Sequence, residues 1–297
     1  MKTRVMFCAA ALAAAASAQA QEKFYILSDQ LFPQLREVSP QTGAIVSSVP
    51  VTGHESLFGG LAALNGSMYS VDGYNDPNPD RLFRIDPATG AGTVVGPTGF
   101  NWNFRSVYAH PTSGVLYGTT DGVGVFTFNL TTGAATLAAN FSGGGPEHDQ
   151  ITAFAINAQG QAYCTDIQQT SLFGLNLQTG ALSFIANIGG DSNWFEDLAF
   201  DSAGTLWGAR FNGGLYTINT TTGAPTLAHF GFYKGIAFVS DACYPDCNAS
   251  GGLTVADFGC FQGKYVLGDL YADCNASGSL TVADFGCFQG KYVLGCP

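Results

Sequence analysis

Short runs in which apolar and polar residues alternate fill the chain from residue 21 to residue 241. Such alternation is typical of β-strands that bury one face. Five of these runs lead into a polar turn ending in Thr-Gly, and a further apolar run follows each turn, which predicts five β-hairpins. The turn glycines are Gly43, Gly90, Gly133, Gly180 and Gly223. Their spacings of 47, 43, 47 and 43 residues indicate one unit repeated five times.

A second hairpin precedes four of the five Thr-Gly units, in segments such as GLAALNGSMYSVD and DLAFDSAGTLWGAR, so a complete unit has four strands. Repeats of roughly 40–50 residues with four strands each are typical of β-propeller blades. The first unit lacks its innermost strand, and a spare strand, KGIAFVSD, ends the region at residues 234–241. We therefore predict a mainly β chain in which residues 21–241 form a five-bladed β-propeller, closed by pairing its two ends. A β-sandwich is the alternative, but sandwiches seldom carry such a period.

The segments that lead into the innermost strands carry aromatic and charged residues together, as in NWNFRSV, NWFEDLA and FGFYKGI. Ligands of propellers usually meet this end of the channel, and flat rings beside hydrogen-bonding groups could hold a sugar or a peptide. The competing interpretation is that these rings fill gaps between blades. The candidate ligand-binding residues are Trp102, Arg105, Trp194, Glu196, Tyr233 and Lys234.

A glycoside hydrolase or lyase is the alternative function for such a propeller. Glycoside hydrolysis needs two carboxylates held across one bond. Glu196 and Asp197 are adjacent, so in a strand they point to opposite faces, whereas Glu147 and Asp149 would share a face but lie in a glycine-rich loop. The chain shows no nucleophile elbow, zinc-protease motif, Cys-x-x-Cys or phosphate loop. We assign no catalytic residue and leave enzyme activity open, with a binding role preferred.

The pattern changes after residue 241, where one phrase occurs twice: Asp246–Gly268 and, nearly unchanged, Asp273–Gly295. In each copy the second half, ADFGCFQGKYVLG, carries its apolar residues at steps of three and four, which predicts a short helix. The first half places oxygen-bearing residues at alternating positions, with a glycine sixth. This arrangement is typical of a loop that wraps a calcium ion in six to eight oxygens.

The chain therefore has two predicted calcium sites, each with ligands at loop positions 1, 3, 5, 7, 9 and 12. The predicted ligands are Asp246, Asn248, Ser250, Gly252, Thr254 and Asp257 in the first loop, and Asp273, Asn275, Ser277, Ser279, Thr281 and Asp284 in the second.

A loop and an exit helix, repeated at an offset of 27 residues with aspartate at position 12, resemble a dockerin domain, and the cysteines resemble a cysteine-containing variant of that family. The resemblance covers residues 246–295 and implies that residues 242–297 form a small calcium-binding α domain. It also implies docking onto a cohesin-like or cell-surface anchoring protein. Ser250 and Ser277 replace an acidic residue common in the family, so we expect weaker calcium binding.

Six of the eight cysteines lie between residues 243 and 296, as expected of a small module stapled by disulfides. The simplest scheme pairs Cys247 with Cys260 and Cys274 with Cys287, each 13 residues apart. Cys243 and Cys296 flank the repeat and could join its ends, although crossed pairings remain open. Cys164, in a predicted strand, is expected to be a buried free thiol.

The first 20 residues combine Lys2 and Arg4 with a small apolar run and Ala-Gln-Ala, the pattern of a secretory signal peptide. No later apolar stretch approaches the roughly 20 residues that span a bilayer. With 22 acidic and 11 basic residues, the formal charge of −11 disfavours nucleic acid or an anionic membrane as partner. We expect a secreted, monomeric protein held at the cell surface.

Overall fold

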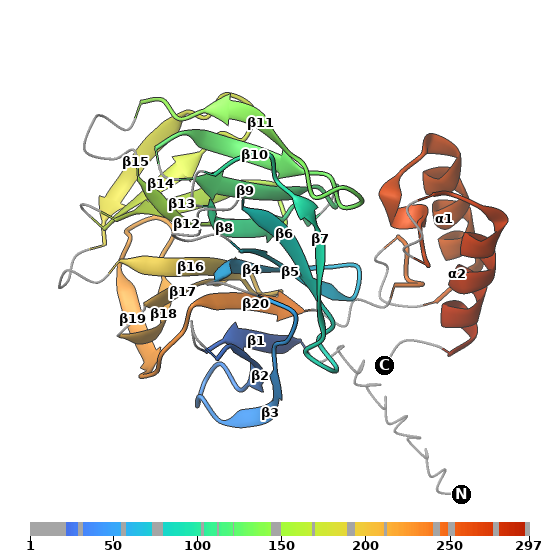
Figure 1. The fold of residues 1–297 in the computed structure, drawn as a ribbon, viewed down its shortest axis with the longest axis horizontal. Helices are drawn as coiled ribbons and strands as arrows, with labels where there is room; N and C mark the ends of the chain where they lie inside the picture. Colours follow the sequence, from blue (N-terminus) through green and yellow to red (C-terminus); the bar gives the residue numbers. More distant parts are fainter. Residues whose placement is uncertain are drawn as a thin grey trace, which may run out of the picture.

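The structure is a computed structural model that describes residues 22–28, 32–54, 58–72, 80–101, 104–111, 113–120, 122–143, 150–167, 170–188, 194–210, 213–239, 244–248, 253–275 and 279–294. Twenty strands form five antiparallel sheets of four strands each, arranged as the blades of a propeller, and two helices follow at the C-terminal end (Figure 1). The mainly β, five-bladed prediction is confirmed.

Each blade runs from an innermost to an outermost strand. In that order, the first blade is β20 (Gly235–Val239), β1 (Lys23–Leu27), β2 (Gln34–Val38), β3 (Ile45–Pro50); the second is β4 (Phe58–Leu64), β5 (Ser67–Asp72), β6 (Arg81–Ile85), β7 (Gly92–Pro97); the third is β8 (Phe104–Ala109), β9 (Leu116–Thr120), β10 (Gly124–Phe128), β11 (Ala135–Asn140); the fourth is β12 (Ile151–Ile156), β13 (Ala162–Asp166), β14 (Ser171–Leu175), β15 (Leu182–Asn187); and the fifth is β16 (Phe195–Phe200), β17 (Leu206–Arg210), β18 (Gly214–Ile218), β19 (Pro225–His229).

The ring closes where the last strand of the propeller joins the first. β20 pairs antiparallel with β1, with Phe24 opposite Phe238 and Ile26 opposite Ile236. The first blade therefore contains strands from both ends of the propeller, as the spare strand predicts. This closure ties the two ends of the ring together by a full strand of backbone hydrogen bonds.

The repeated Thr-Gly phrase forms the turn between the two outer strands of every blade. In the second blade the carboxylate of Asp86 accepts hydrogen bonds from the N–H groups of Ala88 and Thr89. Gly90 then donates to the Asp86 carbonyl at 2.8 Å with φ of 73°. That left-handed backbone conformation favours glycine, which explains why all five turns end in this residue.

Five apolar clusters fill the propeller, one between each pair of neighbouring blades. Burial falls outward along each blade, from β12, buried throughout, to outer strands such as β3, largely exposed. Because each blade buries both faces against its neighbours, none could bury its apolar surface alone.

The C-terminal part consists of α1 (Val255–Leu267), a short 3₁₀ helix η1 (Leu270–Ala272) and α2 (Val282–Leu294). α1 begins at a capping box between Thr254 and Asp257 and ends at Gly268, whose φ of 73° is left-handed. The two predicted helices are confirmed. Among the described residues, no helix has the length and apolarity needed to cross a membrane.

Candidate functional site

A buried carboxylate joins the innermost strands at the centre of the propeller. Asp197, on β16, has no solvent exposure. Its Oδ2 accepts hydrogen bonds of 2.9 Å from the N–H groups of Leu61 on β4 and Ile236 on β20. Its Oδ1 accepts the Ser106 hydroxyl of β8 at 2.7 Å, and that hydroxyl in turn accepts the N–H of Phe154 on β12 at 3.4 Å. All five innermost strands are thus connected through the side chains of Asp197 and Ser106.

A β-bulge frees the Leu61 N–H that binds Asp197, whereas Ile236 lies on β20, whose pairing with β1 has no register shift. The register of β16 shifts between Phe195 and Asp197, and β4, β8 and β12 carry shifts at the corresponding place. A bulge leaves a residue unpaired in the ladder, so its N–H can point to the channel axis instead. Gly59 permits the close approach of β4 to β8, because a Cβ there would lie 2.2 Å from the Phe104 carbonyl oxygen.

The position of Asp197 argues for a structural role in the ring. Burial raises the pKa of Asp197 to about 8, against the lowering effect of the hydrogen bonds from Ile236, Ser106, Leu61 and Leu198. Both oxygens are occupied by the protein's own donors, so neither is placed to meet a substrate. Sequence reasoning considered Asp197 as half of a carboxylate pair with Glu196. No local signal distinguishes these two adjacent acids, because only the converging inner strands show which one is central.

Three of the predicted ligand-binding residues form one connected group. Glu196 is the extra residue at the bulge of β16 and bonds to different partners from Asp197. It accepts the indole N–H of Trp194 at 2.9 Å and forms an ion pair with Lys234 at 2.8 Å. The Glu196 and Lys234 side chains are only 10% and 16% exposed, so the pair is well shielded from water. These three residues present an aromatic ring beside fixed opposite charges.

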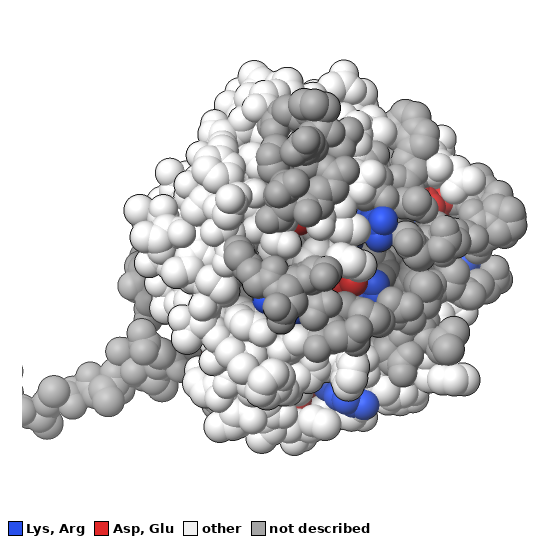
Figure 2. All heavy atoms as spheres, turned by 90° about the vertical axis from the view of Figure 1, so that its left-hand side faces the viewer, with Lys and Arg blue, Asp and Glu red and all other residues white. Residues whose placement is uncertain are grey.

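Of the other predicted ligand residues, the structure describes Arg105 and Tyr233. Arg105 is half-buried on β8, and Tyr233 is buried, with its hydroxyl 3.0 Å from Nδ1 of His229. Trp102 lies outside the described residues, as do the alternative carboxylates Glu147 and Asp149. Figure 2 looks onto the left-hand side of Figure 1 and shows charged atoms of both signs near the middle of this face, with others towards its lower and right-hand edges. The interpretation of these rings as blade filler holds for Phe104 and Phe195, both buried.

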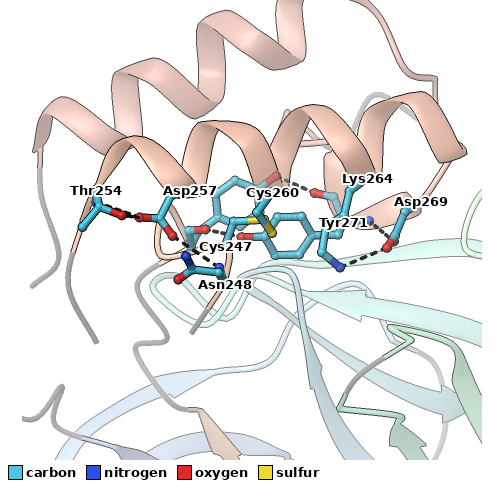
Figure 3. The surroundings of a disulfide bond; sticks show 9 residues. Cys247, Asn248, Thr254, Asp257, Cys260, Lys264, Asp269 and Tyr271 are labelled. Carbon is cyan, nitrogen blue, oxygen red and sulfur yellow. Dashed lines mark hydrogen bonds and ion pairs between the residues drawn. A yellow bond between two sulfur atoms is a disulfide. The ribbon is translucent and has the colours of Figure 1, made fainter. Parts of the chain in front are cut away.

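Each predicted calcium loop ends in a buried aspartate at the start of a helix. Asp257 and Asp284 have no solvent exposure. Asp257 accepts hydrogen bonds from the N–H groups of Thr254 at 2.7 Å and Asn248 at 3.3 Å (Figure 3). Asp284 repeats both distances with Thr281 and Asn275. The two loops therefore have the same geometry where they are described.

The described donors fit an oxygen-liganded cation. The side chain of Asp246, at position 1, contacts the carboxylate of Asp257, at position 12. Two carboxylates in contact repel unless a proton or a cation lies between them. Burial acts to raise the pKa of Asp257, but the hydrogen bonds from Thr254 and Asn248 outweigh it, and the pKa is lowered. A buried Asp257 carboxylate with the Asp246 side chain in contact suits a hard cation such as calcium.

Part of each loop falls outside the described residues, namely Ser250, Gly252 and Ser277. Within the described ranges, no three His, Cys, Asp or Glu side chains gather in a way that could hold a metal ion. The predicted loops draw most of their ligands from Asn, Ser, Thr and backbone oxygens, which are other chemical types. The calcium sites remain a prediction.

One disulfide fastens each loop to the helix that follows it. Cys247 bonds to Cys260 and Cys274 bonds to Cys287, with Cα atoms 5.7 Å apart in both. These are the pairings suggested by the 13-residue spacing. Cys243 and Cys296 lie outside the described residues. Cys164 is a buried free thiol, as expected, and burial raises its pKa.

The two copies of the repeated phrase pack against each other as equivalents. Phe261 stacks on Phe288, 27 residues later, with ring centroids 4.2 Å apart. The crossed pairs Phe258–Phe288 and Phe261–Phe285 both have centroids at 5.1 Å. Tyr244 and Tyr271, again 27 residues apart, stack and donate their hydroxyls to each other's carbonyls. The repeat thus builds a core with approximate two-fold symmetry, which sequence reasoning did not foresee.

Comparison with solved structures finds propellers at low sequence identity. A chain of a nidogen/laminin complex is 10% identical and covers 73% of this chain and 98% of its own, with a TM-score of 0.45. Myxococcus xanthus glutaminyl cyclase is 12% identical and covers 65% of this chain and 90% of its own, with a TM-score of 0.46. No family model and no curated protein matches the sequence. The five-bladed architecture rests on the strand pairing described above.

Proposed function

We propose that this chain is an exported attachment protein. Its C-terminal module, loaded with two calcium ions, docks onto a cohesin-like or cell-surface anchoring protein, and its propeller presents a recognition face to a glycan or a protein. The observation that carries the proposal is the pair of buried aspartates, Asp257 and Asp284, each closing a loop of oxygen donors. Bound calcium would neutralise those carboxylates and fix the loops against the helices.

The disulfides support export. Bonds such as Cys247–Cys260 form and persist in oxidising compartments outside the cytosol. Residues 1–20, which lie outside the described residues, carry the signal-peptide pattern described above. We therefore propose a secreted protein held near the cell surface.

An apolar surface of the module supports docking. Val255 and Val266 on α1 are 86% and 77% exposed, and their counterparts Val282 and Val293 on α2 are 85% and 77% exposed. A Cβ added at any of the four helix glycines would meet no atom within 4 Å, so these glycines face open space. They are Gly259, Gly263, Gly286 and Gly290. Large exposed aliphatic side chains beside flat glycine positions suit a protein partner that covers them.

Calorimetric titration of the full chain with calcium tests the metal sites. We expect two sites in the wild type and loss of both in the double variant Asp257→Asn/Asp284→Asn, because asparagine keeps a hydrogen-bond acceptor but removes the charge. Asp269→Asn is the matched control, since Asp269 pairs with Lys264 outside both loops. Unchanged titration in the double variant, or absence of calcium binding at millimolar concentration, would exclude this proposal.

Docking is tested by immobilising the full chain and offering it exported proteins with calcium or with a chelator. We expect one partner to be retained only with calcium and to be lost on Val266→Lys/Val293→Lys. Identical retention in chelator would mean that the module stabilises the C-terminal end without docking.

Recognition by the propeller is tested by tryptophan fluorescence against a panel of plant and algal glycans. All three tryptophans, Trp102, Trp194 and Trp207, lie in the propeller part of the chain. A ligand at the Trp194–Glu196–Lys234 group should shift the emission, and Trp194→Phe should remove that shift. An emission shift that persists in Trp194→Phe would place the ligand elsewhere.

A further inference from the structure

One blade departs from the others at a position that is otherwise aromatic. Seven residues before the turn glycine, on the third strand of each blade, the second to fifth blades carry Phe83, Phe126, Phe173 and Tyr216. The first blade carries Arg36 at this position. An arginine is the most conspicuous exception in an otherwise regular apolar pattern.

The aromatic ring fills the interface with the preceding blade. Phe83, Phe126 and Phe173 are at most 1% exposed. Each belongs to the apolar cluster between its own blade and the preceding one. Tyr216 packs in the same way against the cluster between the fourth and fifth blades. This aromatic ring therefore fills the interface between neighbouring blades in four of the five cases.

Between the fifth and first blades, where the aromatic ring is missing, the structure has a cavity of about 400 Å³. Arg36 and Ser28 line it on the first blade, together with Ile26 and Val38 from the apolar cluster of this interface. Tyr233 and Phe232, from the segment that crosses from β19 to β20, close the other side. Ile26, which lines the cavity, pairs with Ile236 of β20, so the cavity lies beside the seam where the two ends of the ring meet.

The polar groups in this cavity have unused hydrogen-bonding capacity. Nε of Arg36 and Oγ of Ser28 are both buried from solvent and have no hydrogen-bond partner. Within the described part of the chain, no carboxylate forms an ion pair with Arg36. A buried donor without a partner costs free energy. Such groups in a cavity of ligand size are typical of a binding site.

We propose that this cavity, the seam pocket, binds a carboxylate on a compact ring, such as a hexuronic acid. A guanidinium group matches a carboxylate with two parallel hydrogen bonds. The Ser28 hydroxyl could meet a second polar group, and Ile26, Val38 and the exposed ring of Phe232 could contact the apolar face of a sugar ring. The pocket goes beyond the proposed function and does not depend on calcium binding by the C-terminal module.

The test is calorimetric titration of the full chain, in calcium-containing buffer, with galacturonate, its methyl ester and galactose. We expect binding of galacturonate and at least about tenfold weaker binding of the two neutral compounds, because they lack the charge that Arg36 would meet. Trigalacturonate distinguishes the source of the carboxylate. Tighter binding of the trimer indicates an acidic polysaccharide, whereas equal or weaker binding indicates the free sugar acid; either result supports the pocket.

Arg36→Phe is the sharpest variant, because it restores the residue type of the other blades. It should abolish binding while the tryptophan-detected unfolding midpoint stays equal or rises, since the ring fills the cavity. Arg84→Ala removes the same charge from an exposed position on β6 and should leave affinity within about twofold. If Arg36→Phe fails to fold, Arg36→Lys and Ser28→Ala must each weaken binding.

Three results would overturn the proposal. The first is equal affinity for galacturonate and its methyl ester. The second is wild-type affinity in folded Arg36→Phe, or the same loss in Arg84→Ala. The third is absence of binding by the wild type to galacturonate and trigalacturonate up to about 10 mM, a concentration that would reveal even weak sites.

Discussion

The propeller and the C-terminal module are both built by repetition, but their repeats meet in different ways. Each blade packs against two neighbours that differ from it, so a blade contributes one kind of surface to the preceding blade and another to the next. In the module the two copies face each other, and Phe261 of one copy stacks on Phe288 of the other. The first arrangement joins unlike surfaces and the second joins like surfaces.

This difference explains why the five blades share only a pattern of apolar and polar positions, whereas the two copies in the module are nearly identical in sequence. A blade interface needs complementary apolar volume, which many side-chain combinations supply. Arg36, the one exception to the aromatic residue on the third strand of each blade, changes a single interface and leaves the other four intact. In the module Phe261 and Tyr244 stack on their own counterparts, Phe288 and Tyr271, so a change in one copy alone leaves a mismatched pair. The disulfides add stability that such a small core cannot supply.

The largest destabilisation is expected when the central carboxylate of the propeller, that of Asp197, is removed. Asp197→Ala leaves the N–H groups of Leu61 and Ile236 buried without a partner, which should destabilise the propeller by about 4 kcal/mol. Urea unfolding followed by tryptophan fluorescence measures this selectively, since the module contains no tryptophan. Asp197→Asn, which retains the shape and an acceptor, should cost much less. Equal losses in the two variants would mean that the hydrogen bonds are not the cause.

The next prediction concerns the face-to-face core of the module. Phe261→Ala should destabilise α1 and α2 by about 3–4 kcal/mol, with a matching loss for Phe288→Ala, because each removes a fully buried ring. The double variant should cost less than the sum by about 1 kcal/mol, since the rings stack on each other. Hydrogen exchange of the helix amides in the full chain measures all three values. Phe261→Ala/Phe83→Ala, with one change in each region, should be additive.

The propeller should lose stability as the pH rises. Because burial raises the pKa of Asp197 to about 8 from 3.8, the folded state holds a proton that the unfolded state has released between these values. The contribution of Asp197 to stability is then present in full below about pH 4 and is lost progressively as the pH rises towards about 8. Urea midpoints at pH 5, 6 and 7 measure the slope, and Asp197→Asn should flatten it. An equal slope in that variant would assign the dependence to other groups.

The smallest effect is expected from the helix caps of the module, measured in chelator so that metal binding does not contribute. Thr254→Ala removes the side-chain part of the capping box of α1 and should destabilise that helix by about 1 kcal/mol in chelator. Thr281→Ala should act equally on α2, because its hydrogen bonds to Asp284 have the same lengths. Hydrogen exchange of the first helical turn provides the measurement. A clear inequality between the two variants would break the equivalence of the copies.

Much of the architecture is determined by the sequence alone. The spacing of the five Thr-Gly turns predicts five blades, because a turn that needs a left-handed residue marks the same point in every repeat. The incomplete first unit and the spare strand at residues 234–241 predict ring closure. The 13-residue spacing of the cysteines likewise suggests both described disulfides. These features are local, or they repeat at fixed intervals.

Only the tertiary structure decides which distant residues meet. Asp197 becomes the centre of the ring because donors from three other inner strands, the N–H groups of Leu61 and Ile236 and the hydroxyl of Ser106, converge on its carboxylate, and no local pattern specifies that convergence. Lys234 forms an ion pair with Glu196, 38 residues earlier in the chain. Its neighbour Tyr233 instead forms a hydrogen bond with His229. The seam pocket exists because Arg36 replaces a ring that would fill the blade interface, which becomes visible only once the blades are placed side by side.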